Sequence, residues 1–298
     1  GTQAGMLAAP GGQNLRYALF RATGRPLKGT VILLQGRNEF IEKYFETARD
    51  LSARGFMIAA FDLRGQGGSG RLLRNSRAGY VDSFDHYVAD LDHFFESVVL
   101  PDCRAPFFVL AHSTGGLVAL LAAERLVNRV RRMVLSAPLI RFASGNERTA
   151  RFLSGALTAM GLGAVRLASA RPQSFERNVL TSDRVRYERN IAIAAKAPDL
   201  ALGGPAAAWI SAAIAAMDRI SRPEFLDSMR LPVLMVAAGA DRVVSTSATE
   251  ALARRMRSAG SVTIDGARHE LLQESDFFRN QVLAAFDAFI PGSGDPMF

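Results

Sequence analysis

Ser113 stands where an apolar run gives way to small residues and then resumes. Residues 109 to 116 read Val-Leu-Ala-His-Ser-Thr-Gly-Gly. A strand, a tight turn and a helix fit this pattern. The tight turn needs tiny side chains two residues before and two after the serine, where Ala111 and Gly115 stand. A turn of this kind is a nucleophile elbow, which lifts the serine hydroxyl clear of the sheet edge. Ser113 is therefore the predicted nucleophile.

A serine hydroxyl attacks weakly unless a neighbouring base takes its proton. In the elbow motif an acid and then a histidine follow the serine along the chain, each after a strand. The apolar run 231–240 ends at Asp241, and a second strand-like run ends at His269. Ser113, Asp241 and His269 are therefore the predicted catalytic triad, in which His269 takes the serine proton and Asp241 orients and stabilises the imidazolium.

The chain has three other histidines. His112 adjoins the serine, so we expect its side chain to point away from the catalytic face and to pack or hydrogen-bond in the interior. His86 and His93 lie seven residues apart in the predicted helix 81–100, among several aspartates, which is typical of a solvated polar face. No Cys or further His joins them, so the sequence predicts no metal site.

Short apolar segments alternate with helical patterns along most of the chain. Strands are predicted at 15–21 as an early edge strand, at 30–34, 57–62, 107–112 and 130–136, and in the runs before Asp241 and His269. Helices are predicted at 44–54, 81–100, 116–126, 246–257 and 276–290. This order predicts an α/β fold with a mostly parallel central sheet and helices on both faces. Active groups gather at the carboxyl ends of such strands, where all three triad residues fall.

The alternation stops between residues 139 and 222, where apolar residues recur at helical spacing around Phe152 and Trp209. We therefore expect one catalytic core, formed by residues 1–138 and 223–298, with residues 139–222 inserted as a helical cap over the catalytic edge. The underside of a cap lines the pocket below it. Trp209 is for this reason a predicted substrate-pocket residue.

An acyl-transfer reaction also needs hydrogen-bond donors for the oxyanion. One donor is the backbone N–H of the residue after the nucleophile, here Thr114, and the other comes from the loop after an early strand. That loop, 33–39, contains Gly36, which lets the backbone approach closely. We assign the second donor to the backbone N–H of Arg37, whose side chain is expected to be a solvated loop charge.

Five sequence motifs are found along the predicted core. They are an H-G-x-x-E-like loop with Gly36, Glu39 and Tyr44; a D-x-R-G-x-G-x-S segment with Asp62, Arg64, Gly65, Gly67 and Ser69; and the three segments 111–116, 239–244 and 266–274 around the triad. Together they resemble the monoacylglycerol lipase and lysophospholipase branch of the α/β-hydrolase superfamily, above all the bacterial L2-type lysophospholipases. Gln35 replaces the usual His and Ala111 the usual Gly, but neither change removes a group from the mechanism.

The resemblance implies a serine hydrolase that cleaves carboxylic esters of lysophospholipids or monoacylglycerols through an acyl-enzyme, without a metal or an organic cofactor. Two alternatives within enzymes are a carboxylesterase for small soluble esters and a serine peptidase. The latter would need a carboxylate for the substrate amine, for which Glu147, Glu176 and Asp183 are the cap acids to consider. A non-catalytic binding protein is disfavoured by the intact triad.

The charge of the chain bears on its partners. The formal net charge is +8, and residues 139–222 hold eleven Arg and one Lys against six acids. Arginine suits phosphate and anionic membrane surfaces, so peripheral contact with an anionic membrane is one interpretation; compositional bias is the other. The arginines are scattered and no nucleic-acid motif accompanies them, so no nucleic-acid partner is predicted. A single cysteine, Cys103, fits a reducing compartment, and the expected location is cytoplasmic, peripheral to the inner membrane.

Overall fold

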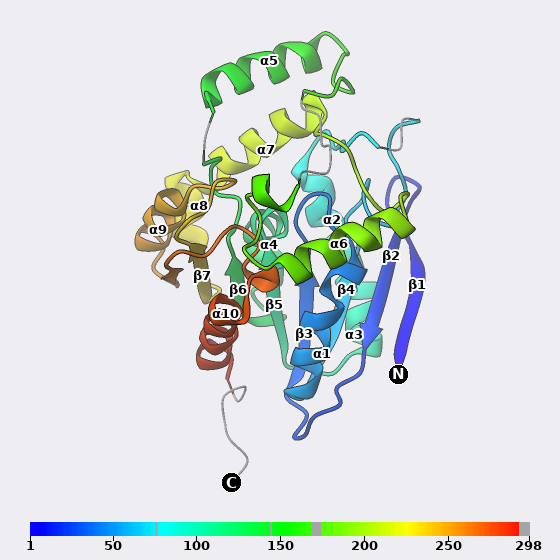
Figure 1. The fold of residues 1–298 in the computed structure, drawn as a ribbon, viewed down its shortest axis with the longest axis vertical. Coiled ribbons are helices and arrows are strands. Elements are labelled where there is room, and N and C mark those ends of the chain that lie inside the picture. The colour runs from blue at the N-terminus through cyan, green and yellow to red at the C-terminus, as the bar shows by residue number, and fades with distance from the viewer. Residues whose placement is uncertain (75–76, 144, 168–173, 292–298) are drawn as a thin grey trace.

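An eight-stranded sheet forms the centre of the computed structural model, which describes residues 1–74, 77–143, 145–167 and 174–291 (Figure 1). Its strand order is β1-β2-β4-β3-β5-β6-β7-β8. The strands are β1 (Thr2–Ala9), β2 (Gln13–Phe20), β3 (Gly29–Leu34), β4 (Phe56–Phe61), β5 (Phe107–His112), β6 (Val130–Ser136), β7 (Val233–Ala238) and β8 (Ala259–Ile264). β1, β2 and β4 pair antiparallel, and every other neighbouring pair is parallel. The predicted mostly parallel α/β sheet is confirmed.

The central parallel strands β3 and β5 are mostly apolar, and helices cover both faces of the sheet there. Every residue of β3 and of β5 is buried, as expected for strands packed on both sides. In Figure 1, α1 (Phe45–Ala53) and α10 (Asp276–Phe289) lie in front of the sheet, and α2 (Phe84–Phe94) and α4 (Thr114–Leu126) lie behind it. The main hydrophobic core therefore fills the space between the sheet and these two helix layers.

The remaining core helices are short or continue those already named. They are η1 (Ile41–Tyr44), η2 (Phe95–Val99), α3 (Leu100–Asp102), α8 (Pro223–Ser228), α9 (Thr246–Arg255) and η4 (Leu271–Gln273). The predicted helix 81–100 thus divides into α2, η2 and α3. No helix in the described part of the chain has the length and apolar character needed to cross a bilayer.

The sequence analysis placed the edge strand wrongly. β2, which covers the predicted strand 15–21, is the second strand, because β1 pairs along its whole length and forms the edge. β1 gives almost no alternating signal, since most of its residues are exposed and Met6 keeps 56% of its surface in solvent. Two glycines, Gly11 and Gly12, both at positive φ, reverse the chain between the two strands.

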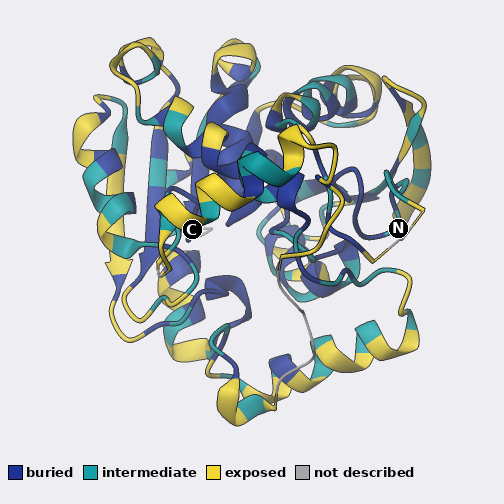
Figure 2. Ribbon diagram, turned by 90° about the horizontal axis from the view of Figure 1, so that it is seen from above, coloured by how far each residue is buried: buried dark blue, intermediate teal, exposed yellow. Residues whose placement is uncertain are grey.

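The stretch between β6 and β7, predicted as the cap, forms α5 (Glu147–Ala159), η3 (Phe175–Arg177), α6 (Arg184–Lys196) and α7 (Ala207–Ile220). α7 is mostly buried and its apolar residues belong to the main hydrophobic core. α6 and α5 each have one buried residue, Tyr187 and Ser154. In Figure 2, seen from above, exposed stripes run along the outer helices and the sheet lies dark beneath. The three helices of this stretch are therefore held to the core in different ways.

Candidate active site

Ser113 follows β5 directly and precedes the first residue of α4. Its φ of 50° and ψ of −114° lie in a region that non-glycine residues rarely occupy, and such strain is concentrated at functional sites. A Cβ on Gly115 would lie 2.7 Å from the carbonyl oxygens of both Leu34 and Gln35, so only glycine fits there. β3 and the start of α4 are thus brought close together, and Ser113 projects from the predicted tight turn.

The structure brings Ser113, His269 and Asp241 together. His269 Nε2 lies 3.1 Å from Ser113 Oγ, and His269 Nδ1 lies 2.8 Å from Asp241 Oδ2. The other oxygen of Asp241 accepts the backbone N–H groups of Val243 at 2.7 Å and Val244 at 3.0 Å. Because the carboxylate accepts a hydrogen bond from Nδ1–H, Nε2 is left unprotonated and can receive the serine proton. This arrangement is suited to activating a serine nucleophile.

The ionisation of Asp241 is set by opposing influences. Burial disfavours its charged form, but the hydrogen bond and the positive charge of His269, with the two backbone N–H groups of Val243 and Val244, hold the pKa of Asp241 below its usual value. The side chain of Asp241 keeps only 1% of its surface in solvent and that of His269 keeps 5%. Asp241 is therefore a carboxylate at neutral pH, shielded from water and aimed at the imidazole.

His112 is not directed away from this group, and that part of the sequence prediction is wrong. Its ring centroid lies 4.8 Å from that of His269, although its Nδ1 does make the predicted interior hydrogen bond, to the carbonyl oxygen of Ser136 at 3.0 Å. The positive φ of Ser113 breaks the alternation of faces that a regular strand would impose. Burial lowers the pKa of His112 to about 4, so its ring is neutral beside His269.

The backbone N–H groups of Arg37 and Thr114 make no hydrogen bond to any described residue. Thr114 is the first residue of α4, where N–H groups have no partner within the helix. In the loop after β3, the N–H of Gly36 is occupied by Glu39 Oε2 at 2.6 Å. The N–H of Arg37, one residue further on, is without a partner among the described residues and stays the predicted second oxyanion donor.

A cavity of about 300 Å³ opens in front of Ser113. The core contributes the loop 36–40, Lys43, His112, Val243, His269 and Glu270, and the cap contributes Leu180, Ala201 and one face of α6. The α6 residues in the lining are Tyr187, Asn190, Ile191 and Ala194. These four positions follow the i, i+3, i+4, i+7 spacing of a single helix face. The sequence analysis missed this face because most of its neighbours in α6 are charged.

Trp209, the predicted pocket residue, does not line this cavity. Its side chain is 4% exposed, its ring packs 5.8 Å from that of Phe84, and the guanidinium of Arg37 lies 5.6 Å from its centroid. α7 lies too deep for Trp209 to reach the substrate space. The Arg37 side chain, expected to be solvated, is instead half-buried between the core and the cap.

A chain of buried charges borders the cavity on the core side. Lys43 Nζ lies 2.6 Å from both Glu39 Oε1 and Glu270 Oε1, and the Tyr44 hydroxyl donates to Glu39 Oε2 at 2.6 Å. Burial alone would lower the pKa of Lys43, but the two carboxylates raise it above its usual value. Burial opposes the ionisation of Glu39, but the charge of Lys43 lowers the pKa of Glu39 to about 2. Burial raises the pKa of Glu270, although Lys43 opposes this shift.

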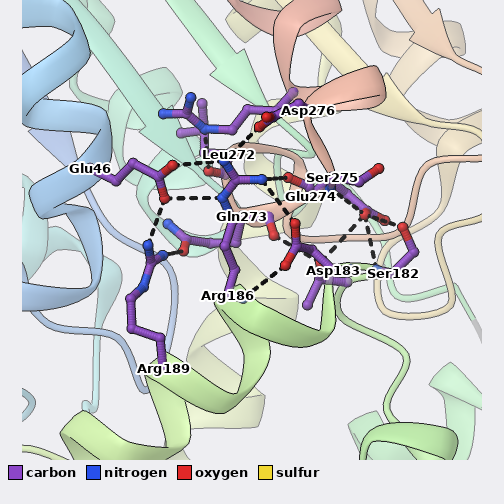
Figure 3. Close-up of polar contacts among 12 residues, drawn as sticks. Glu46, Ser182, Asp183, Arg186, Arg189, Leu272, Gln273, Glu274, Ser275 and Asp276 are labelled. Carbon is purple, nitrogen blue, oxygen red and sulfur yellow. Dashed lines mark hydrogen bonds and ion pairs between the residues drawn. The ribbon is translucent and has the colours of Figure 1, made fainter.

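Salt bridges and hydrogen bonds hold α6 on the core (Figure 3). Arg186 binds Glu46 at 2.7 and 3.0 Å and Asp276 at 2.6 Å, while Arg189 binds Glu46 at 2.6 Å and Gln273 Oε1 at 2.7 Å. The hydrogen bonds from both arginines outweigh the burial of Glu46 and lower its pKa to about 2. Polar contacts thus position the helix whose face closes the cavity.

The segment before α7 contacts the loop after β3. The Leu202 N–H donates to Asn38 Oδ1, and Arg37 Nη1 donates to the carbonyl oxygen of Gly203 at 3.1 Å. Asn38 has a φ of 61°, a conformation that asparagine tolerates better than most residues. The loop with the unoccupied Arg37 N–H therefore rests directly on the cap.

The other predicted polar residues lie apart from this site. His86 Nδ1 contacts Asp82 at 2.8 Å on an exposed face, and His93 Nε2 lies 2.9 Å from the carbonyl oxygen of Ala8. Within the described residues no cluster of three His, Cys, Asp or Glu is arranged to hold a metal ion. Cys103 is a free thiol, and burial raises its pKa to about 12.

Comparisons with known proteins agree on one group of relatives. The family model described as "Serine aminopeptidase, S33" matches residues 25–276. Lysophospholipase L2 of Escherichia coli (strain K12) is 33% identical, over 95% of this chain and 85% of that protein. Monoacylglycerol lipase of Mycolicibacterium smegmatis is 26% identical over 90% of each chain. A solved structure of a soluble variant of monoglyceride lipase from Saccharomyces cerevisiae superimposes with a TM-score of 0.78 at 20% identity, over 98% of this chain and 94% of that one.

Proposed function

Because this chain belongs to the serine aminopeptidase, S33, family of serine hydrolases, we propose that it hydrolyses carboxylic esters of lysophospholipids or monoacylglycerols through an acyl-enzyme. The observation that carries the proposal is the continuous hydrogen-bonded line from Ser113 through His269 to Asp241 at one wall of a cavity. The relatives named lysophospholipase and monoacylglycerol lipase support the two substrate classes.

Each step of the reaction has a group in place. His269 Nε2 takes the proton of Ser113 as its oxygen attacks the ester carbonyl, and Asp241 stabilises the imidazolium that forms. The N–H groups of Arg37 and Thr114 receive the developing oxyanion. The imidazolium then protonates the leaving alcohol, and a water molecule activated by His269 releases the fatty acid from Ser113.

The cavity offers little support for a peptidase, which needs a carboxylate to bind the substrate amine. The two carboxylates in its lining, Glu39 and Glu270, are both paired with Lys43. Three cap acids considered from the sequence are engaged by arginines outside the lining, namely Glu147 with Arg151, Glu176 with Arg184 and Asp183 with Arg186. An ester substrate, which needs no amine site, suits these surroundings better.

We further infer a peripheral contact between the cap and an anionic lipid surface. We also propose a cytoplasmic location, because a single cysteine fits a reducing compartment. On the outer side of the cap, Phe152 keeps 74%, Met160 64% and Leu153 48% of its surface exposed. Arg148, which lies four residues before Phe152 on α5, is exposed as well. Apolar residues beside cations are typical of interfacial binding.

Vesicle sedimentation tests the membrane contact. Vesicles with anionic lipid should bind the protein, and binding should weaken as salt rises, because exposed charges are screened beyond about 8 Å at physiological ionic strength. Phe152→Ser should reduce binding several-fold. Phe277→Ser is the matched control, since Phe277 is also 74% exposed but lies on α10. Equal binding by both variants and the wild type would rule out this surface.

A substrate panel with active-site labelling tests the enzymatic proposal. The panel contains lysophospholipids and monoacylglycerols of matched chain length, and short p-nitrophenyl esters. A serine-directed phosphonate should modify Ser113 and abolish turnover, and Ser113→Ala should fold normally but lose about 10³-fold or more in kcat. Hydrolysis of short esters alone would indicate a small-ester carboxylesterase. Full activity after phosphonate treatment, without an adduct on Ser113, would exclude Ser113 as the nucleophile.

A further inference from the structure

We propose that the side chain of Arg37 binds the phosphate group of a lysophospholipid substrate. The inference rests on the proposed function, because it names the substrate class that the same cavity selects. It concerns the guanidinium of Arg37, whereas the backbone N–H of this residue is assigned to the oxyanion hole.

Arg37 is an unusual cation because it is half-buried without an anionic partner. Among the described residues its guanidinium makes one hydrogen bond, from Nη1 to the carbonyl oxygen of Gly203, and stacks on Trp209. No described carboxylate lies within ion-pair distance of it. The other half-buried arginines near the cavity, Arg186 and Arg189, each bind at least one carboxylate. Burial lowers the pKa of Arg37 to about 10, so the charge persists at neutral pH.

The remaining donors of Arg37 are available to a ligand. Nε and Nη2 have no hydrogen-bond partner among the described residues, yet they are not sealed polar atoms, unlike Arg141 Nη1 and Arg279 Nη2. Arg37 belongs to the cavity lining, in the same loop as the oxyanion donor. A partly desolvated cation is stabilised by an anion. Because Arg37 borders the cavity and has unused donors, we expect it to bind an anionic group of the ligand.

Charge is distributed unevenly around the cavity. The two carboxyl groups of the lining, Glu39 and Glu270, lie together around Lys43 on one side of the cavity. Near Arg37 a second cation, Arg166, approaches Gly203, since a Cβ built on that glycine would lie 3.1 Å from Arg166 Nη1. A ligand with a neutral ester and an anionic group would bind most favourably with its anionic group toward Arg37 and away from the carboxylates.

Phosphate is the anion that fits this donor and this position. A guanidinium presents paired N–H groups that match two phosphate oxygens, and such charge-assisted pairs are stronger than neutral hydrogen bonds. In a lysophospholipid only the glycerol backbone separates the scissile ester from the phosphate. With the ester carbonyl at the Arg37 N–H, the phosphate lies within reach of the side chain of the same residue. Monoacylglycerol has no anion at this place and gains nothing from the guanidinium.

Selectivity measured on matched substrates tests the inference. The kcat/KM values for palmitoyl lysophosphatidylglycerol and monopalmitoylglycerol are compared in the wild type, Arg37→Met and Arg37→Lys. The ratio of lysophospholipid to monoacylglycerol should fall about tenfold or more in Arg37→Met, since hydrogen bonds to charged groups are among the strongest single contacts. Arg37→Lys should recover part of it, because it restores the charge without the paired donors. Arg257→Met, an exposed arginine far along the chain, is the matched control.

Each other outcome has a defined meaning. A parallel loss on both substrates, with the ratio unchanged, would show that Arg37 only seats the loop on the cap and would overturn the inference. Competitive inhibition by inorganic phosphate that Arg37→Met abolishes, with the ratio unchanged, would assign the site to free phosphate and also overturn it. Cleavage of monoacylglycerol but not lysophospholipid by the wild type would refute the inference alone, whereas cleavage of neither would refute the proposed function.

Discussion

The two walls of the cavity are built on different physical principles. The core wall carries Ser113, Asp241 and His269 on turns that follow buried strands, fixed by backbone hydrogen bonds and close packing. The opposite wall is a face of α6, which buries little apolar surface and is held by the salt bridges of Arg186 and Arg189. The proposed catalytic groups are thus held by packing, while the proposed substrate surface on α6 depends on charges that salt and acid weaken.

The cap shows the same difference, because α7 is held by apolar packing whereas α6 is held by salt bridges. It follows α6 in the chain, yet Ile214, Met217 and Ile220 on its inner side are each no more than 1% exposed. Apolar burial of this kind is insensitive to salt and stabilises far more than exposed ion pairs. We therefore expect substitutions in the core wall to affect turnover, those in α7 to affect stability, and those in the α6 salt bridges to affect substrate binding.

The largest expected effect is that of Asp241→Asn on the core wall. The amide can donate a hydrogen bond to Nδ1 instead of accepting one from it, so the imidazole adopts the wrong tautomer and kcat should fall by roughly 10³-fold. KM and the urea midpoint should change little. Asp265→Asn is the matched control, because Asp265 is an exposed neighbour of the same loops. A large loss in the control and none in Asp241→Asn would place the acid elsewhere.

A smaller but clear effect on stability is expected when a buried side chain of α7 is shortened and leaves a cavity. Ile214→Ala removes a side chain that is 1% exposed and should lower the free energy of unfolding by about 2–5 kcal/mol. Urea denaturation measures the change. Val185→Ala on α6 is the control, because Val185 is 77% exposed and should change stability by less than about 0.5 kcal/mol. Similar losses in the two variants would contradict the distinction between α6 and α7.

The smallest expected effect concerns the salt bridges of α6. Arg186→Met should lower the free energy of unfolding by about 1.5–3 kcal/mol, a limited loss because Arg189 still binds Glu46. KM should rise several-fold more than kcat falls, since the variant loosens the substrate wall and leaves the triad intact. Kinetics at low and high salt provide the measurement, and salt should raise KM less in the variant than in the wild type.

Arg184→Met is the control for this variant, since Arg184 lies on the same helix and its ion pairs among the described residues are with the exposed Glu176 and Glu188.

Acid should also weaken the attachment of α6, because it protonates Glu46. The pKa of Glu46 is lowered to about 2 in the folded protein, so its contribution is complete above its unfolded pKa and is lost as the pH falls toward 2. Glu46→Gln should show less of this acid loss. An unchanged acid profile would remove Glu46 from the attachment of α6.

The sequence predicted what depends on strand ends and missed what depends on packing between distant segments. Ser113, Asp241 and His269 each follow an apolar strand. Each of these strands can be predicted from its own local pattern. The cavity face of α6 could not be predicted, because its four residues alternate with charged residues that bind the core. The environment of Arg37 depends on Gly203 and Trp209, far away along the chain. No local pattern separates a solvated arginine from one enclosed by a cap.

The position of the cap between β6 and β7 has a consequence for the growing chain. β7 and β8 join the sheet at the edge formed by β6, and they alone bring Asp241 and His269 to Ser113. A polypeptide interrupted before β7, on the ribosome or by a protease, carries Ser113 without the proposed acid and base. Its serine is then no more nucleophilic than an ordinary alcohol. Reactivity is therefore conferred last, only after the segment that encloses the site has been synthesised.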